Sequence, residues 1–426
     1  MFDSGGSSPS VASPVRAAEG SPEVAEEREF GPDGVQITYM SGDIESPEFL
    51  GGLGGEFDFV VVRDVLVWLR DCEAFLNALR AVCSHSTRVV FVSHSVIWRP
   101  LIRLSQMLGL TPQAPEENVL ALTDLVRFAR LSEFELCWAD TRQLFPFRLL
   151  FVGPAVNRVL APLPLIRRLN LRWYASFRPL VAEPLGPSPT VSVVVPARNE
   201  EGNILSIVER TPDLCDRMEL IFVEGNSSDA THSTMLAAAE MFPHRNIKVL
   251  QQPGRGKYDA VKTGFDAATG DILMILDADM TVPPEDLPRF FRAITSGNGE
   301  FIMGTRLVYP LEEQSMRFLN IIANRMFSRL FSWMLGQPIT DTLCGTKVMT
   351  RSSYGRIAAG REYFGDFDPF GDFDLIFGAA RLQMSIVEIP IRYREREWGV
   401  TQISRFRNGL TLARMVLFAY RRFKVS

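Results

Sequence analysis

The sequence lacks the features that mark several classes of protein. No stretch reaches about 18 uninterrupted apolar residues, the length that a membrane-spanning helix needs. The most apolar regions are interrupted by Arg148, Asn157, Arg325 and Arg329. The first Met is followed by small and acidic residues rather than by a basic segment and an apolar run, so we expect no signal peptide. These absences predict a cytoplasmic protein whose membrane contact, if it has any, is peripheral.

Excess positive charge and paired cysteines are also missing. The formal net charge is −5 and the pI is about 5.6, which argues against a nucleic-acid partner for the surface as a whole. Five cysteines are scattered without CxxC spacing, which predicts free thiols in a reducing compartment and no zinc site. With 426 residues, 46% of them hydrophobic and 22% charged, the chain can form two or more packed domains.

The amino-acid composition of the amino-terminal half changes twice along the chain. Residues 1–33 are rich in small and acidic residues, which predicts a disordered tail because little apolar area can be buried. Residues 34–177 alternate apolar runs with an amphipathic segment, and we expect a small parallel sheet built from "VQITYM", "FDFVVV" and "TRVVFVS". Residues 178–189 are rich in proline and predict a stiff linker.

Residues 190–404 show a strand, turn and helix pattern that repeats. Apolar runs end in polar, turn-rich segments in "VSVVVPARNEEGN", "LIFVEGNSSDAT" and "DILMILDADM". This pattern predicts a doubly wound α/β sheet, whose ligands bind at the carboxyl ends of the strands. Residues 405–426 predict a basic amphipathic helix at the carboxyl end.

Two carboxylates, Asp277 and Asp279, end one of these runs. If the chain turns, they can converge on Mg²⁺ or Mn²⁺, which prefer oxygen ligands. Asp279 or Thr281 could instead cap the following helix, and a base role is also open. Arg255 and Lys257 in the glycine-rich stretch just upstream fit a phosphate-bearing ligand; a plain loop is the alternative.

Residues 190 to about 404 resemble glycosyltransferase family 2, with the GT-A fold, in the branch of the polyprenyl- and dolichyl-phosphate sugar synthases. The resemblance is carried, in order, by "VVVPARNEEGNI", "FVEGNSSDAT", "GRGKYDAVKTGF", "ILDADM", "MGTRL", "DTLCGTKV", "GDFDLIF" and "RYREREWGVTQI". It implies a nucleotide-diphosphate sugar donor, a divalent cation (Mg²⁺ or Mn²⁺) and inversion at the anomeric carbon.

The resemblance also implies roles for individual residues. Asp277 and Asp279 match the metal motif, and the catalytic positions are Asp372, Asp374 and Arg396. The positions that match nucleotide-sugar contacts are Pro196, Ala197, Arg198, Glu200, Glu224, Gly225, Lys257, Asp277, Ala278 and Arg306. An acid at 372 or 374 could deprotonate or orient a hydroxyl acceptor, whereas a phosphate acceptor is already anionic.

Three positions depart from the family pattern. Gly225 stands where relatives carry a second acid, Thr281 where many place a Gln ligand, and Gln402 where a Lys is frequent. For Arg306 and Arg396 the resemblance implies contact with the donor phosphates, which a planar guanidinium matches well; an ion pair with a neighbouring acid is the alternative.

The amino-terminal domain, residues 34–177, resembles the second half of a class I methyltransferase, a partial Rossmann-like α/β domain. Asp43 would lie near an adenine and Asp64 after the next strand. The glycine-rich turn that should hold the cofactor is missing from this truncated domain. We therefore expect no methyl transfer, and either a docking role or a start site that has lost the first strand.

Two basic, apolar stretches, residues 316–336 and 404–426, predict amphipathic helices at a membrane surface; core packing with extended arginines is the alternative. The sequence thus predicts an inverting, metal-dependent hexosyltransferase of the cell envelope, peripherally bound to the inner membrane face, with a polyprenyl phosphate or other lipid-linked acceptor. A saccharide hydroxyl acceptor and a non-catalytic scaffold are the alternatives.

Overall fold

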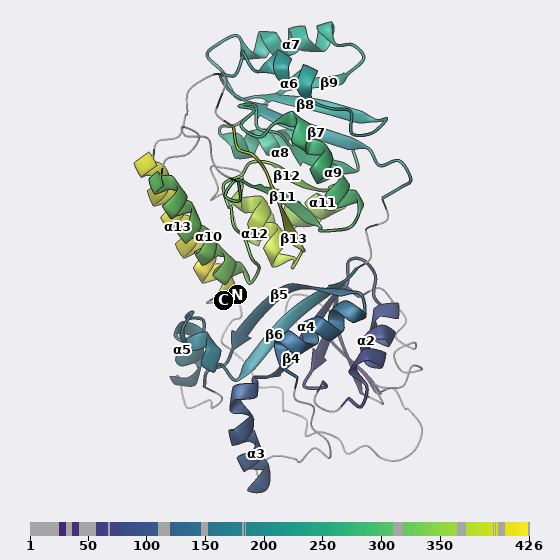
Figure 1. Ribbon diagram of the computed structural model, residues 1–426, viewed down its shortest axis with the longest axis vertical. Helices are drawn as coiled ribbons and strands as arrows, with labels where there is room; N and C mark the ends of the chain where they lie inside the picture. The colour runs from purple at the N-terminus through teal and green to yellow at the C-terminus, as the bar shows by residue number, and fades with distance from the viewer. Residues whose placement is uncertain are drawn as a thin grey trace.

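The protein has two sheet-containing parts and a short hairpin (Figure 1). The computed structural model describes residues 25–30, 36–41, 57–66, 69–109, 120–145, 152–180, 183, 185–309, 318–363, 372–394, 396, 398 and 405–424. All five cysteines are free thiols, as predicted.

The carboxyl-terminal part is built on a seven-stranded sheet. Its strands are β7 (Val191–Ala197), β8 (Met218–Glu224), β9 (Asn246–Gln251), β10 (Ile272–Ile275), β11 (Phe301–Thr305), β12 (Lys347–Thr350) and β13 (Ile386–Pro390). They are ordered β13-β11-β12-β10-β7-β8-β9. Only β12 runs against its two neighbours, and the other pairings are parallel. The prediction of an α/β fold with a mostly parallel sheet is therefore confirmed.

Helices cover both faces of this sheet. They are α6 (Ile204–Arg210), α7 (Thr231–Met241), α8 (Lys257–Ala267), α9 (Leu287–Thr295), α10 (Phe318–Leu335), α11 (Arg351–Ala359), α12 (Phe373–Arg381) and α13 (Arg405–Phe423). Alternate residues of β7 enter different cores: Val194 packs into one cluster, and Val193 and Val195 pack into the other. The period of two along a strand thus explains why the apolar run of β7 is continuous.

The amino-terminal part has a four-stranded sheet in the order β3-β4-β6-β5. Its strands are β3 (Phe59–Arg63), β4 (Arg88–His94), β5 (Phe134–Arg142) and β6 (Arg172–Pro179), and its helices are α2 (Cys72–Ala81), α3 (Arg99–Met107), α4 (Leu122–Leu131) and α5 (Val152–Val159). The prediction of a parallel sheet holds for β3 and β4 but is wrong for β6, which lies antiparallel between β4 and β5. An apolar run has the same pattern in either direction, so the sequence could not fix this.

The resemblance of this part to a methyltransferase stays a prediction. Asp64 does follow β3 directly, where its carboxylate lies 3.2 Å from His94 Nδ1 and 3.3 Å from an Arg172 nitrogen. Asp43 lies outside the described residues.

The prediction that residues 1–33 form a disordered tail is wrong for the last part of this range. β1 (Ala25–Phe30) pairs antiparallel with β2 (Gln36–Ser41) in a separate two-stranded sheet. The two strands satisfy each other's backbone hydrogen bonds, and this pairing cannot be predicted from the composition of one segment. The segment "VQITYM" therefore forms a strand, but outside the four-stranded sheet.

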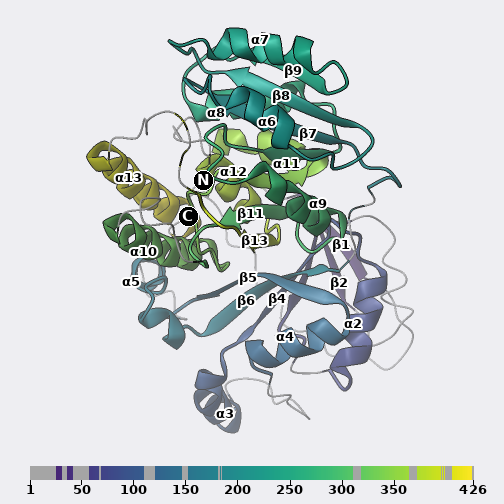
Figure 2. The same cartoon turned by 45° about the horizontal axis from the view of Figure 1, so that its top comes forward.

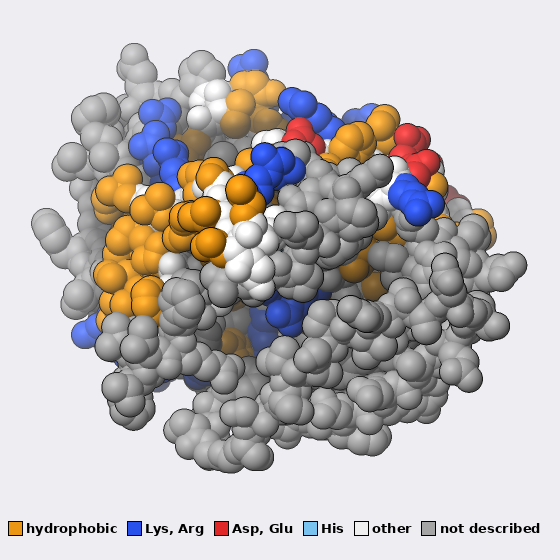
Figure 3. All heavy atoms as spheres, turned by 90° about the horizontal axis from the view of Figure 1, so that it is seen from below, with side chains coloured by type: hydrophobic (Ala, Val, Ile, Leu, Met, Phe, Trp, Pro, Cys, Tyr) orange, Lys and Arg blue, Asp and Glu red, His pale blue; other side chains and the backbone are white. Residues whose placement is uncertain are grey.

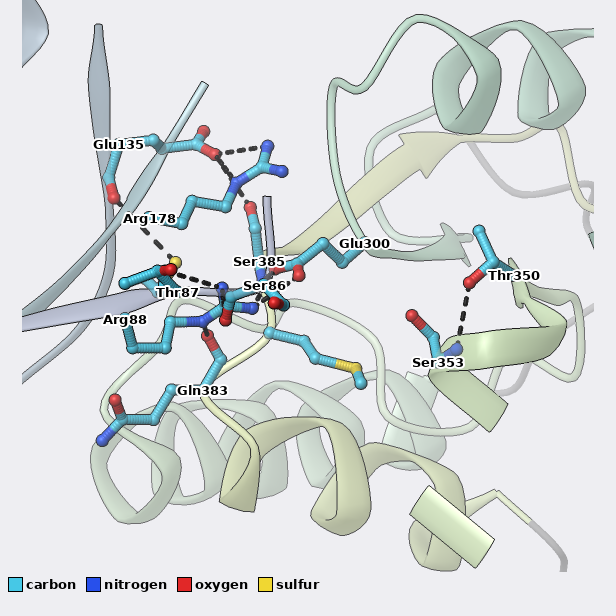
Figure 4. Close-up of polar contacts among 12 residues, drawn as sticks. Ser86, Thr87, Arg88, Glu135, Arg178, Glu300, Thr350, Ser353, Gln383 and Ser385 are labelled. Carbon is cyan, nitrogen blue, oxygen red and sulfur yellow. Dashed lines mark hydrogen bonds and ion pairs between the residues drawn. The ribbon is translucent and has the colours of Figure 1, made fainter. Parts of the chain in front are cut away.

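A polar interface joins the two parts (Figure 4). β6 extends to Pro179, two residues into the predicted linker. The buried guanidinium of Arg88 contacts both carboxylate oxygens of Glu300 at 2.5 and 2.6 Å and donates to Gln383 O at 2.9 Å. Arg178 donates to Glu135 at 2.8 Å and to Gly297 O at 3.0 Å. These long-range contacts fix the sheets relative to each other.

The predicted carboxyl-terminal helix is present as α13, which lies beside α10 (Figure 2). Both helices contribute side chains to the core, including Phe331, Met334 and Met415. Lys424 Nζ donates to Asp140 Oδ2 at 2.8 Å and so ties the end of α13 to β5. None of the helices that the structure describes is long and apolar enough to cross a membrane. For these residues, the alternative of core packing is thus supported.

Candidate active site

Several of the residues expected to hold the nucleotide sugar meet at one edge of the seven-stranded sheet. Pro196 and Ala197 end β7, and Glu224 ends β8 directly beside Ala197. Asp277 follows β10, which pairs in parallel with β7. Because parallel strands end at the same edge, the sequence pattern placed these residues correctly.

Gly225 is one of the three departures from the family pattern, and its surroundings are tight. Its N–H donates to Ala197 O at 2.9 Å. A Cβ atom at this position would lie 3.0 Å from Arg198 Cβ and 3.1 Å from Ala197 O. The stem of Arg198 thus lies against Gly225. Burial alone would raise the pKa of the neighbouring Glu224, but hydrogen bonds from Ser227 and Asn226 hold it below its usual range.

Asp277 is paired with Lys257, the first residue of α8. Asp277 Oδ1 lies 2.5 Å from Lys257 Nζ. Burial disfavours both charges, yet their attraction prevails: it lowers the pKa of Asp277 and raises the pKa of Lys257. A Cβ at Gly345 would overlap both the Asp277 carboxylate and Lys257 Nζ. Position 345 therefore requires glycine for this pair to form.

Asp279 lies in a turn and does not cap a helix. Its Oδ1 accepts from Thr281 N at 3.2 Å and from Thr281 Oγ1 at 2.8 Å, and its Oδ2 lies 2.7 Å from an Arg396 nitrogen. The next helical segment begins at Pro284 and α9 at Leu287, with neither Asp279 nor Thr281 as the cap. The helix-cap alternative is therefore wrong.

Arg396 joins the segment after β13 to the segments that follow β7 and β10. Besides Asp279, it contacts Glu200 Oε1 at 3.2 Å, and Glu200 Oε2 accepts from Asn203 at 2.7 Å. Burial raises the pKa of Glu200 to about 7, against the lowering effects of Arg396 and Asn203. Nearby, the ring of Trp398 lies so close to Gly202 that a Cβ there would overlap it.

Arg306 is held by a buried acid. Its Nε and terminal nitrogen contact the two oxygens of Asp341 at 2.6 and 2.8 Å, and its backbone N–H donates to the same carboxylate at 3.0 Å. The guanidinium also lies over the Tyr393 ring, 5.0 Å from its centroid. Arg306 therefore forms an ion pair with a neighbouring acid, which was the alternative expected from the sequence, and this acid is buried. Contact with a donor phosphate stays a prediction.

The two acids expected on the acceptor side have different surroundings. Asp372 Oδ1 lies 2.5 Å from Nζ of the fully buried Lys347, and the Asp372 carboxylate contributes to the raised pKa of Lys257. Asp374 Oδ2 instead accepts from Arg361 Nε at 3.0 Å. Asp372 therefore belongs to the charge cluster around Asp277, whereas Asp374 is bound in a separate ion pair.

Asp341, Gly345 and Lys347 are functional candidates that the sequence reasoning missed. All three lie in "DTLCGTKV", which the resemblance includes without assigning roles. The occurrence of an acid, a glycine and a lysine together in one family block could have pointed to them. Ala278 is buried between the paired acids. Gln402, the third departure from the family pattern, lies outside the described residues.

The donor set fits a divalent cation that is shared with a ligand. Within the described ranges there is no group of three His, Cys, Asp or Glu side chains that could hold a metal alone. Asp277 and Asp279 offer two hard oxygen donors, and glycine at 345 leaves no side chain over Asp277. Mg²⁺ and Mn²⁺ are commonly held in this way, by one or two carboxylates completed by phosphate and water.

Residues 192–357 match the family model described as glycosyl transferase family 2. The chain contains a family 2 glycosyltransferase domain. Its site edge, with Pro196, Glu224, Asp277 and Asp279, lies within the matched range. The predicted resemblance is confirmed for this domain, whereas the methyltransferase-like part is not confirmed.

Two curated relatives carry the same description, undecaprenyl-phosphate 4-deoxy-4-formamido-L-arabinose transferase. The protein from Photorhabdus laumondii is 32% identical over 218 residues, which are 50% of this chain and 63% of that protein. The protein from Enterobacter sp. strain 638 is 28% identical over 218 residues, 50% of this chain and 62% of that protein. The chain thus spans less than two thirds of these relatives.

Solved structures of glucosyl-3-phosphoglycerate synthase from Mycobacterium tuberculosis are also similar. One, in complex with Mn²⁺, uridine diphosphate and glucosyl-3-phosphoglycerate, is 19% identical, with a TM-score of 0.42 over 56% of this chain and 81% of that chain. Another, in complex with Mn²⁺ and uridine-diphosphate-glucose, is 20% identical with a TM-score of 0.42, over 56% of this chain and 80% of that chain.

Proposed function

We propose that the protein is an inverting, metal-dependent glycosyltransferase. It moves a hexose from a nucleotide-diphosphate sugar to a polyprenyl phosphate or another lipid-linked acceptor at the inner membrane face. The family 2 domain and the names of the curated relatives support this reaction class. The observation that carries it is the placement of Asp277 and Asp279 after β10, each facing its own cation.

The charge arrangement explains how a donor diphosphate would bind. Asp277 and Asp279 would hold Mg²⁺ or Mn²⁺, which neutralises the negative charge on the leaving diphosphate. Lys257 and Arg396 neutralise these carboxylates in the free protein. A diphosphate that enters offers both cations new anionic partners, and a guanidinium matches two phosphate oxygens at once.

On the acceptor side, Asp372 favours a phosphate over a hydroxyl. Its Oδ1 is committed to the buried Lys347, which suits an electrostatic or orienting role better than proton abstraction. A phosphate oxygen is already anionic and needs no base. It attacks the anomeric carbon opposite the leaving diphosphate, the new carbon–oxygen bond forms as the old one breaks, and the configuration inverts.

The decisive experiment is mass spectrometry of lipid extracts. The protein is incubated with membranes, Mg²⁺ or Mn²⁺, and a panel of nucleotide sugars. We expect one nucleotide sugar to yield a new hexosylated polyprenyl phosphate, and chelation of the metal to abolish it. Transfer only to a saccharide would support the hydroxyl alternative. Calorimetry that detects no nucleotide-sugar binding with metal present would contradict both readings and support the scaffold.

A further inference from the structure

The amino-terminal part carries two helical segments whose apolar side chains face water. α3 has no buried residue, and its Leu104 and Met107 are 51% and 79% exposed. The short 3-10 helix before it, Val96–Trp98, exposes Ile97. After α5, Leu165 is 88% exposed. Isolated exposed apolar residues are ordinary, but a contiguous group of them marks a binding surface.

The two segments form one surface. Trp98 Nε1, at the start of α3, donates to Leu169 O at 2.8 Å, and Leu169 ends the 3-10 helix Ile166–Leu169 that follows α5. We name this the α3–α5 surface, defined by Ile97, Leu104, Met107, Val159, Leu165 and Leu169. Figure 3 looks at this end of the molecule: on the part that the structure describes, hydrophobic side chains gather at one side with Lys and Arg around them.

The charges in these segments are all of one sign. Residues 95–109 contain Arg99 and Arg103, residues 152–169 contain Arg158, Arg167 and Arg168, and neither segment contains Asp, Glu or Lys. Arg103, Arg158 and Arg168 are exposed among the apolar side chains. The whole chain, in contrast, has a net charge of −5. A negatively charged bilayer would therefore be repelled by the protein on average and attracted by this surface.

We propose that the α3–α5 surface binds the surface of an anionic phospholipid bilayer. Exposed Leu and Met side chains enter the boundary between headgroups and acyl chains, and the arginines lie at the level of the lipid phosphates. This site differs from the stretches that the sequence favoured for membrane contact, because much of α10 and α13 packs into the core. It adjoins them, since Trp333 of α10 donates to Pro162 O, just after α5, at 3.0 Å.

The test is flotation of the full-length protein with lipid vesicles. Vesicles of phosphatidylglycerol and phosphatidylethanolamine are compared with vesicles of phosphatidylcholine alone, at low and high salt. We expect the wild type to float with the anionic vesicles and to be released by salt, because the arginine contribution is screened. Failure to bind the anionic vesicles at low salt would overturn the proposal.

A pair of double variants makes the test specific. Leu104→Asp with Leu165→Asp places two carboxylates on the α3–α5 surface, and we expect the partition coefficient onto anionic vesicles to fall by about tenfold or more. Leu236→Asp with Met241→Asp alters α7, where both residues are also exposed, and should bind like the wild type. Equal binding of the two double variants would refute the assignment.

A second copy of the chain is the competing occupant. Sedimentation without lipid distinguishes it: a dimer in the wild type that the Leu104→Asp, Leu165→Asp variant loses would overturn the lipid assignment, whereas a monomer in both supports it. Because no step measures sugar transfer, these results stand whether or not the proposed reaction is correct. Unchanged binding of a nucleotide sugar by the variant would show that the active-site edge is intact.

Discussion

Asp277 and Asp279 are separated by one residue, yet each is neutralised by a different cation. Lys257 comes from the start of α8, and Arg396 lies 117 residues after Asp279 along the chain. The loss of either carboxylate would leave its cation without this partner and remove an oxygen donor from the proposed metal site. Single substitutions here should therefore affect catalysis far more than folding, because both carboxylates are partly exposed.

Asp279→Asn keeps the shape of the side chain and removes its charge. We expect sugar transfer to fall by about 100-fold or more, since a charge-stabilising group at the leaving diphosphate is weakened. Metal-dependent nucleotide binding in calorimetry should weaken in parallel, while the thermal unfolding midpoint changes little. Asp213→Asn, at an exposed pair with Arg245, is the matched control. Wild-type turnover in Asp279→Asn would rule out the metal role.

Gly345→Ala tests the tight packing around the Lys257–Asp277 pair. The added Cβ must displace the Asp277 carboxylate or Lys257 Nζ, so we expect at least about tenfold weaker metal-dependent nucleotide binding. Gly355→Ala is the control, because a Cβ there meets nothing within 4 Å; in helix α11 it should stabilise the protein by about 0.5–1 kcal/mol. Equal nucleotide affinity of the two variants would contradict the packing argument.

At the scale of elements, Glu219 links three neighbouring strands. It lies in β8 and accepts from Ser192 of β7 and from Thr269, just before β10, and it pairs with Lys248 of β9 at 2.6 Å. Burial would raise its pKa, but these partners lower it to about 2 from an ordinary value of 4.5. The ionised carboxylate is thus favoured in the folded state. Its stabilising contribution is complete above the unfolded pKa and is lost as the pH falls from 4.5 toward 2.

Glu219→Gln should consequently flatten the acid limb of the stability curve. We expect the free energy of unfolding at pH 7 to fall by about 2 kcal/mol, and the difference from the wild type to shrink as the pH approaches 3. Urea denaturation at a series of pH values measures this. Glu240→Gln, at an exposed site on α7, should follow the wild-type curve. A constant difference between Glu219→Gln and the wild type at all pH values would argue against the linkage.

For the whole molecule, the ion pair between the buried Arg88 and the partly buried Glu300 decides how the two sheets are joined. Glu300 also accepts from Ser385 N at 3.0 Å, so one carboxylate connects the amino-terminal sheet to the turn before β13. Removal of one member of such a pair leaves a buried charge without compensation, which costs more than the intact pair contributes.

Glu300→Ala should reduce the free energy of unfolding by about 3 kcal/mol, because Arg88 stays buried without its carboxylate. Urea denaturation followed by fluorescence measures the loss, and a second transition would show that the two parts have become independent. The double variant Arg88→Met, Glu300→Met should be more stable than Glu300→Ala. A double variant less stable than Glu300→Ala would contradict this explanation.

The sequence by itself determined the class of fold and the edge of the sheet that carries the site. Continuous apolar runs that end in acids and turns predict buried strands with polar residues at their carboxyl ends, and this pattern is local. The family blocks then singled out Asp277, Asp279, Glu200 and Arg396 as candidate site residues. Positions that depart from the family pattern, such as Gly225, could also be recognised in the sequence, but the atoms that pack against them could not.

Only the tertiary structure decided which charges meet. Arg306 pairs with the buried Asp341, and Asp372 and Asp374, two residues apart, pair with Lys347 and Arg361. The direction of β6 and the pairing of β1 with β2 were likewise undetermined. The physical reason is the same in each case. The residue type determines whether a side chain must be buried or must find a partner of opposite charge. Which residue becomes that partner depends on segments that are brought together only by folding.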